Sequence, residues 1–216
     1  MVRPDWPAPA RVRALVTTRD LGDMASEQGR RELRKHLPAE PHWLRQVHGT
    51  AVAFPPQAKE FPVADAAVVR TAGTVGAVMV ADCMPVFFVD ERATTVAVAH
   101  AGWRGLAAGV LEATLDAMGA SSGQVLAWLG PAIGARVYEV GEDVHEALAG
   151  HETAFVSNRL GHWLLDLYAL AREKLERHGV RRIYGGGFCT YSDAGRFFSY
   201  RRSRTGARMA AVIWLT

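Results

Sequence analysis

The chain has 216 residues, of which 49% are hydrophobic and 22% are charged, so it contains enough apolar material for a folded core. Its formal net charge is +3, and its two cysteines are too few for a disulfide framework, which indicates a reducing compartment. The N-terminus lacks the apolar core of a signal peptide, and no apolar run approaches the roughly 20 residues of a membrane helix. We therefore expect a cytoplasmic protein without a membrane partner.

Short apolar runs bounded by Gly, Pro or other turn residues predict β-strands along most of the chain. In chain order, the predicted strands cover residues 12–17, 43–47, 51–54, 66–69, 77–81, 86–89, 95–99, 125–129, 136–140, 154–156, 182–184, 196–200 and 209–215.

Apolar residues that recur on one face predict helices between some of these strands. The predicted helices cover residues 105–119, 142–150 and 166–179, with a weaker pattern over residues 30–37. Gly119, Gly150 and Gly179 mark the C-terminal ends of the first three, and Asp166 is the expected N-cap of the third.

The order of these elements favours one fold class. Strands outnumber helices and do not alternate with them regularly, which argues against a doubly wound parallel sheet. We expect an α+β fold, a layered sandwich of mixed β-sheets flanked by helices. No internal repeat or low-complexity linker interrupts the chain, so residues 1–216 are expected to form a single domain.

Three side chains suited to metal binding stand where an apolar run meets a turn signal. They are His48 in "RQVHGT", Cys83 in "ADCMP" and His100 in "AHAGWRG". Imidazole and thiolate groups bind zinc, and a set of three ligands leaves one position open for water or substrate. The long spacings between them are unlike a Cys-x-x-Cys motif, so a buried cysteine and two hydrogen-bonded histidines remain an alternative. Cys189 is expected only to pack.

Five segments in this order resemble the laccase-domain family: "ADCMPV", "VAHAGWRG", "GPAIGARVYEVG", "FCTYSD" and "FFSYRR". Members of that family carry names such as multicopper polyphenol oxidase, zinc-dependent purine nucleoside phosphorylase and peptidoglycan-editing factor. The resemblance extends from about Gln46 to Ile213 and implies a layered α+β sandwich. It also implies a metal site whose ligands are His48, Cys83 and His100. Asp82 then either orients one of the histidines or caps a turn.

The oxidase name conflicts with the histidine content of the chain. A multicopper oxidase holds its copper cluster with many histidines, typically in His-x-His pairs, whereas this chain has eight histidines and no such pair. Multicopper chemistry is therefore excluded. A single copper ion in a His₂Cys site is an alternative to zinc, although a less favoured one.

The resemblance implies phosphorolysis of adenosine, inosine or methylthioadenosine, with phosphate as co-substrate, and some adenosine deamination. Such chemistry needs an anion site, for which Arg104 and the C-terminal Arg201 and Arg202 are candidates. We expect Arg201 and Arg202 on a surface hairpin. No nucleic-acid-binding motif accompanies the basic residues, so the expected partners are a purine nucleoside and phosphate.

A flat base needs an aromatic surface, and its departure needs a proton donor. Trp103, Tyr138 and Phe198 are candidates for stacking, although ordinary packing is the favoured explanation for each of them. Asp82, Glu139 and Tyr138 are candidates for the general acid, and the sequence favours none of them.

The chain departs from the family pattern near both ends. Residues 17–19 match the start of an N-terminal element, which makes Arg19 a further site candidate, but the segment that follows is shorter than usual. Near the C-terminus Arg208 is retained, whereas Ser203 stands where the family carries an acidic residue.

Three other functions remain open at this stage. The chain can be a hydrolase that edits peptidoglycan precursors, a metal-free hydrolase with Cys83 as nucleophile and His100 as base, or a binding protein without turnover. The sequence does not determine the preferred nucleoside or the oligomeric state.

Overall fold

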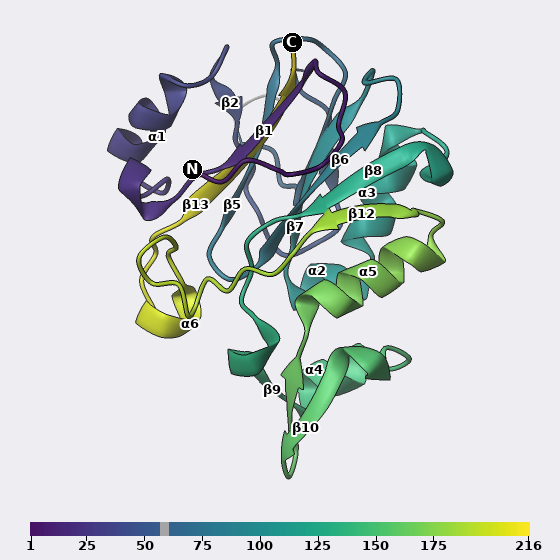
Figure 1. The fold of residues 1–216 in the computed structure, drawn as a ribbon. Coiled ribbons are helices and arrows are strands. Elements are labelled where there is room, and N and C mark those ends of the chain that lie inside the picture. The colour runs from purple at the N-terminus through teal and green to yellow at the C-terminus, as the bar shows by residue number, and fades with distance from the viewer. Residues whose placement is uncertain (57–60) are drawn as a thin grey trace.

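A computed structural model describes residues 1–56 and 61–216, and its strands form three sheets (Figure 1). The first sheet, in spatial order, contains β1 (Val12–Val16), β13 (Met209–Leu215), β5 (Val75–Val80) and β2 (Pro41–His42). The second contains β12 (Arg182–Gly185), β8 (Val125–Leu129), β6 (Met84–Asp90), β7 (Val96–Ala101), β4 (Ala66–Val69) and β3 (Val52–Ala53). The third contains β10 (Phe155–Arg159), β11 (His162–Leu165) and β9 (Glu139–Gly141).

The α-helices connect and cover these sheets. They are α1 (Glu27–Arg34), α2 (Trp103–Ala108), α3 (Val110–Met118), α4 (Glu142–Ala147), α5 (Leu167–Arg177) and α6 (Tyr200–Ser203). No helix within residues 1–56 and 61–216 is long and apolar enough to span a bilayer.

The two larger sheets pack face to face. Alternate residues of β6 point to opposite faces, so Phe87 and Val89 pack against Val78 and Ile213 of the first sheet. Val86 and Phe88 face the other way, toward the helices. Because both faces of β6 are covered, all seven of its residues are buried, which explains its nearly continuous apolar sequence.

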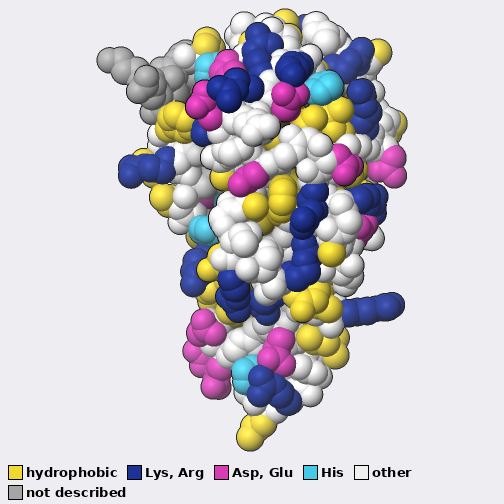
Figure 2. Space-filling view, turned by 90° about the vertical axis from the view of Figure 1, so that its left-hand side faces the viewer, with side chains coloured by type: hydrophobic (Ala, Val, Ile, Leu, Met, Phe, Trp, Pro, Cys, Tyr) yellow, Lys and Arg dark blue, Asp and Glu magenta, His cyan; other side chains and the backbone are white. Residues whose placement is uncertain are grey.

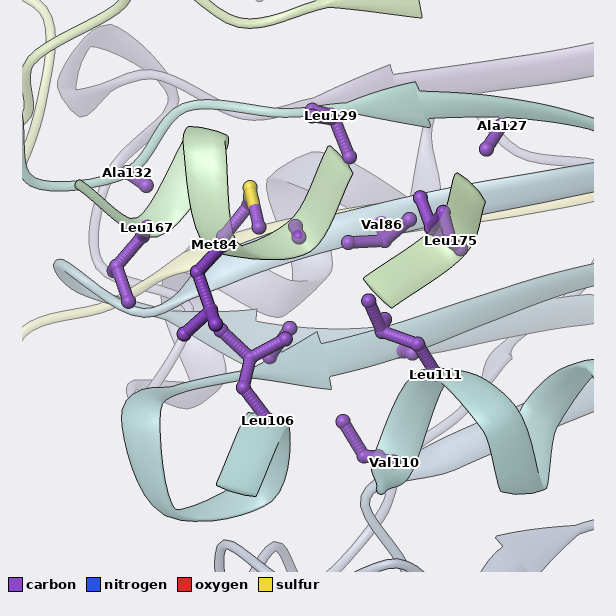
Figure 3. Packing of buried hydrophobic residues seen from close by; sticks show 14 of the residues in the cluster. Met84, Val86, Leu106, Val110, Leu111, Ala127, Leu129, Ala132, Leu167 and Leu175 are labelled. Carbon is purple, nitrogen blue, oxygen red and sulfur yellow. The ribbon is translucent and has the colours of Figure 1, made fainter. Parts of the chain in front are cut away.

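Helices form the outer layers of the sandwich. Helices α2, α3 and α5 cover the outer face of the six-stranded sheet, on the right in Figure 1, and α1 covers the four-stranded sheet on the left. Figure 3 shows part of the packing between these three helices and the six-stranded sheet, where Leu111 of α3 and Leu175 of α5 lie in one cluster with Val86 of β6. The third sheet and α4 project at the lower end of Figure 1. The fold is thus the expected layered α+β sandwich.

Four predicted elements differ from the structure. The strand predicted over residues 136–140 is shorter, because residues 135–137 form a 3-10 helix and β9 begins only at Glu139. Residues 43–47 form no strand apart from an isolated bridge at Arg45, and the strand lies earlier, in β2. The helix predicted over residues 105–119 is two helices, because Gly109 adopts a left-handed φ of 95° between α2 and α3. Residues 196–200 are not a strand. The chain instead turns into α6, whose first turn is capped by the Ser199 hydroxyl, so the C-terminal arginines do not lie on a hairpin.

Candidate metal site

The three predicted metal-binding side chains converge at one edge of the six-stranded sheet. Strands β6 and β7 are antiparallel, with Pro85 opposite His100, so Cys83 just before β6 lies beside the end of β7. His48 approaches from the loop between β2 and β3. One ligand atom from each of the three residues lies within 4.8 Å of the others. His100 is buried, Cys83 is half-buried and His48 is exposed, so the group opens to solvent on one side.

The donor set and its spacing fit one metal ion. Cys83 Sγ lies 3.9 Å from His48 Nε2, and a zinc ion bonded at about 2.0–2.3 Å to sulfur and nitrogen joins atoms at this separation. Gly102 leaves the space for this approach. A Cβ atom at position 102 would lie 2.7 Å from Cys83 Sγ and 3.3 Å from His48 Cδ2.

The buried carboxylate of Asp65 forms hydrogen bonds with two members of this group, His48 and His100. It is fully buried and accepts a hydrogen bond from His100 Nδ1 at 2.8 Å. It also accepts hydrogen bonds from the backbone N–H groups of Val47, His48 and Gly49, at 3.1, 2.9 and 2.8 Å. These hydrogen bonds keep the pKa of Asp65 below its usual value although burial opposes this.

Cys83 and His100 strongly polarise each other. Burial alone would raise the pKa of the Cys83 thiol, but the neighbouring His100 and His48 outweigh it and lower that pKa to about 6. Burial alone would lower the pKa of His100, but the Cys83 and Asp65 charges raise it to about 9. Without metal, the two residues therefore form a thiolate–imidazolium pair at neutral pH.

Asp82 does not contact either histidine through its carboxylate. Its Oδ1 accepts a hydrogen bond from the Thr190 hydroxyl at 2.6 Å, and its Oδ2 accepts one from the backbone N–H of Arg201 at 2.6 Å. Asp82 therefore caps the start of α6. Its φ of 84° places it in the left-handed region, and these contacts hold it there.

The site opens into a cavity of about 750 Å³, within the usual size range of ligand sites. Among the residues that the structure describes, its lining includes four arginines, Arg104, Arg201, Arg204 and Arg208, and one acidic residue, Asp82. None of the four arginines forms an ion pair within the described part of the chain. Figure 2 shows Lys and Arg side chains scattered over one face of the molecule. A ligand that carries negative charge suits such a cavity.

Aromatic rings accompany these arginines. The guanidinium carbon of Arg104 lies 4.3 Å from the centre of the Trp103 ring, and that of Arg201 lies 5.0 Å from the Tyr138 ring. Burial raises the pKa of Tyr138, so its hydroxyl keeps its proton at neutral pH. A second hollow, of about 850 Å³, lies beside α1, but His48, Cys83 and His100 do not line it.

Several other predicted site residues lie outside the cavity lining. The Arg202 guanidinium donates to the carbonyl oxygens of Thr190, Tyr191 and Phe197, each at 2.7 Å, which is a structural role. The Arg19 guanidinium carbon lies 4.9 Å from the Phe198 ring, and neither residue lines the cavity.

Glu139 and Cys189 have other partners. Hydrogen bonds from Arg159 and Asn158 hold the Glu139 carboxylate and lower its pKa to about 2, so it is ionised and donates no proton near neutral pH. Cys189 Sγ accepts a hydrogen bond from the backbone N–H of Gly134 at 3.3 Å, away from the three metal-binding side chains.

Sequence reasoning missed Asp65 and Gln46. The Gln46 side chain donates to the Met79 carbonyl at 2.8 Å and accepts from the Met79 N–H at 2.7 Å, which holds the His48 loop against β5. A signal for Asp65 was present in "PVADAAVV", where one acidic residue interrupts an apolar run and is therefore buried with partners.

Comparison with known proteins gives several relatives that match nearly the whole chain. A purine nucleoside phosphorylase of Pseudomonas aeruginosa is 47% identical over 235 residues, covering 98% of this chain and 97% of that protein. The purine nucleoside phosphorylase YfiH of Escherichia coli is 43% identical, covering 100% of this chain and 98% of that protein. The first alignment is longer than the 216 residues of this chain, so the relative carries inserted residues.

Solved structures share the fold. A crystal structure of a Neisseria meningitidis protein matches with a TM-score of 0.93 at 43% identity, covering 99% of this chain and 98% of that one. The structure of YlmD from Geobacillus stearothermophilus matches with a TM-score of 0.87 at 28% identity, covering 97% of this chain and 93% of that one. In sequence, residues 17–216 match the profile of one family. The chain therefore belongs to the multi-copper polyphenol oxidoreductase laccase family.

Proposed function

We propose that this protein is a zinc-dependent purine nucleoside phosphorylase that converts a nucleoside and phosphate to a free base and ribose 1-phosphate. One observation carries the proposal: the His48–Cys83–His100 group opens into a cavity lined by four arginines. Side chains that could hold a metal, next to arginines that could bind an anion, suit a reaction in which phosphate is a substrate. Names of relatives at 43–47% identity support the same reaction.

Residues of the cavity take distinct roles in this proposal. Arg104 and Arg201 bind the phosphate co-substrate, since arginine pairs with phosphate oxygens through two parallel N–H groups. The Trp103 and Tyr138 rings bound the space for the base. A bound zinc ion supplies Lewis acidity toward a substrate oxygen.

Phosphorolysis breaks the bond between the sugar C1′ and the base nitrogen and forms a bond between C1′ and a phosphate oxygen. The base leaves with the electron pair and needs a proton or a hydrogen bond. Tyr138 is the proposed donor, because it lines the cavity and burial keeps its hydroxyl protonated. Both carboxylate oxygens of Asp82 already accept hydrogen bonds, which disfavours Asp82 in this role.

Adenosine deamination is a second candidate at the same site, because His48, Cys83 and His100 would hold a metal ion with one position left open, and such an ion would supply Lewis acidity for hydrolysis. A peptidoglycan-precursor hydrolase is an alternative with the same metal and a different substrate. The metal-free alternative, with a Cys83 thiolate as nucleophile, is favoured by the low pKa of that thiol. Copper in place of zinc is consistent with the donor set and with the family name.

Product analysis by mass spectrometry tests these candidates. Zinc-loaded protein is incubated with adenosine, with and without phosphate, beside Cys83→Ala. The matched control is Cys189→Ala, because Cys189 is the other cysteine of the chain and does not line the cavity. We expect phosphate-dependent adenine and ribose 1-phosphate from the wild type and from Cys189→Ala, and neither from Cys83→Ala.

Each alternative gives a different result in this assay. Inosine that forms without phosphate would make deamination the main reaction. Activity that survives chelation but not alkylation of Cys83 would support the metal-free hydrolase. No turnover of adenosine by protein with stoichiometric zinc would contradict the nucleoside proposal and direct the search to muramoyl precursors.

A further inference from the structure

The backbone of Asp65 is fixed on both sides before its side chain is considered. It immediately precedes β4, its N–H donates to the Ala51 carbonyl at 2.9 Å, and its own carbonyl accepts from the His100 N–H at 2.7 Å. Backbone hydrogen bonds therefore connect this residue to the segment before β3 and to β7. Its side chain has 0% exposure, so water does not compete for its oxygens.

One carboxylate holds segments that carry two of the three proposed ligands. Oδ1 accepts from His100 Nδ1 and from the backbone N–H of His48, and Oδ2 accepts from the N–H groups of Val47 and Gly49. Three consecutive N–H groups thus converge on a single side chain. His48 has a φ of 60°, a left-handed conformation that costs free energy for a residue other than glycine. The hydrogen bonds to Asp65 offset this cost and keep the loop in place.

The bond to His100 also decides which ring nitrogen is available. A proton on Nδ1 is needed for donation to the carboxylate, so Nε2 is the nitrogen left for a metal ion. A carboxylate partner of this kind fixes the ring orientation and increases the basicity of the ligand.

We infer that Asp65 is the positioning residue of the metal site, joining the His48 loop and the His100 ring through one buried carboxylate. This inference rests on the metal ligands named under the proposed function, and it does not depend on which reaction the metal serves. It means that the site is already assembled before the metal binds. It also means that loss of the carboxylate disturbs at least one ligand whichever way the replacement side chain turns.

The variant Asp65→Asn illustrates how loss of the carboxylate disturbs a ligand. An asparagine has the same size but replaces one acceptor oxygen with an NH₂ donor. If the NH₂ takes the place of Oδ1, it faces His100 Nδ1–H and the His48 N–H. If it takes the place of Oδ2, it faces the N–H groups of Val47 and Gly49. In each orientation the NH₂ group faces other N–H donors. Either the His100 imidazole or the His48 loop therefore loses its hydrogen bonds to residue 65.

The matched control is Asp90→Asn. Asp90 is a buried aspartate at the far end of β6, and its carboxylate accepts hydrogen bonds from the N–H groups of Thr94 and Thr95 and from the Thr94 hydroxyl. Its replacement also disrupts a buried carboxylate that binds backbone N–H groups, but no metal ligand is attached to it. A merely structural role of Asp65 would make the two variants behave alike.

The experiment measures zinc dissociation constants by chelator competition and the absorption spectrum of the cobalt-substituted proteins, both on folded protein. We expect Asp65→Asn to bind zinc about 10- to 100-fold more weakly and to give an altered cobalt spectrum. Asp90→Asn is expected to match the wild type in both. Equal zinc affinity and an unchanged cobalt spectrum in folded Asp65→Asn would overturn the inference.

A measurement on the wild type covers the case in which Asp65→Asn does not fold. Nitrogen-15 NMR of the histidine rings reports which nitrogen of His100 carries the proton in zinc-loaded protein. A proton on Nδ1 supports the inference, and a proton on Nε2 with metal on Nδ1 overturns it. A wild type that binds metal in this manner but does not phosphorolyse nucleosides would contradict only the proposed reaction. A wild type that binds no metal would contradict both.

Discussion

The Asp65 carboxylate lies 2.8 Å from Nδ1 of His100, and both residues are buried where β4 and β7 run side by side. Because the same carboxylate also binds the loop that carries His48, the geometry of the proposed metal site depends on a residue outside the His48–Cys83–His100 group.

The space around the ligands depends on Gly102. Gly102→Ala places a Cβ atom 2.7 Å from Cys83 Sγ, so the thiol and the His48 ring must move apart. We expect zinc affinity to fall at least about tenfold, as for other disturbances of a metal site's surroundings. Chelator competition measures this, with Gly123→Ala as control because nothing lies within 4 Å of a Cβ at position 123. Unchanged zinc affinity in Gly102→Ala would mean that the ligands do not need this close approach.

The anion-binding role of Arg104 predicts a specific kinetic effect. Hydrogen bonds to charged groups contribute about 1.5–3 kcal/mol, so Arg104→Gln should raise the KM for phosphate roughly 10- to 100-fold. Steady-state kinetics at varied phosphate measures this, with Arg136→Gln as control because Arg136 does not line the cavity. A phosphate KM within twofold of the wild type would remove Arg104 from the anion site.

Substitution of Arg202 should lower the stability of the protein and leave phosphate binding unchanged. Its guanidinium serves three backbone carbonyl groups, so Arg202→Gln leaves several of them without a donor. We expect the free energy of unfolding to fall by at least about 2 kcal/mol, with the KM for phosphate unchanged in the folded fraction. Urea unfolding and steady-state kinetics measure the two quantities. A raised phosphate KM without loss of stability would place Arg202 in the anion site after all.

The thiol of Cys83 should react as a thiolate in metal-free protein. Burial alone would raise its pKa, but His100 and His48 lower it to about 6, so the thiolate persists down to that pH. Alkylation by iodoacetamide, followed in Cys189→Ala to remove the second cysteine, should slow only as the pH falls through about 6. Bound zinc should protect the thiol. A midpoint near the usual thiol value would show that the histidines do not polarise the site.

Acid stability should depend on Glu139. A hydrogen bond from Arg159 lowers the pKa of Glu139 from 4.5 to about 2. Below pH 4.5 the unfolded chain therefore binds more protons than the folded one at this position, and stability decreases as the pH falls toward 2. Glu139→Gln should make urea unfolding less dependent on pH in this window, by a small amount because the pair is exposed to solvent. Glu146→Gln is the control, and an equal effect of both variants would contradict this account.

Local sequence patterns were sufficient for most of the sheet framework. The runs at β4, β8 and β13 are apolar throughout, and their predicted bounds match the structure. Cys83 and His100 could be placed at one sheet edge because each follows or ends an apolar run beside a turn signal.

Long-range contacts account for what the sequence did not reveal. Asp65 acts on His100 from 35 positions away, and Asp82 caps α6 from 119 positions away, so neither partner could be read from neighbouring residues. In residues 196–200, a run rich in aromatic residues predicted a strand, but the Ser199 cap and the Asp82 contact with Arg201 favour a helix that begins at Tyr200.

The most direct test of the central claim is a zinc titration of metal-free protein, with ribose 1-phosphate formation from inosine and phosphate as the readout. The account predicts that the rate rises linearly to one equivalent of zinc and then stays constant, and that Cys83→Ala shows no such rise. Copper in place of zinc should give less product at the same stoichiometry. Product formation that is already maximal without metal, or absent at one equivalent of bound zinc, would contradict a zinc-dependent phosphorylase.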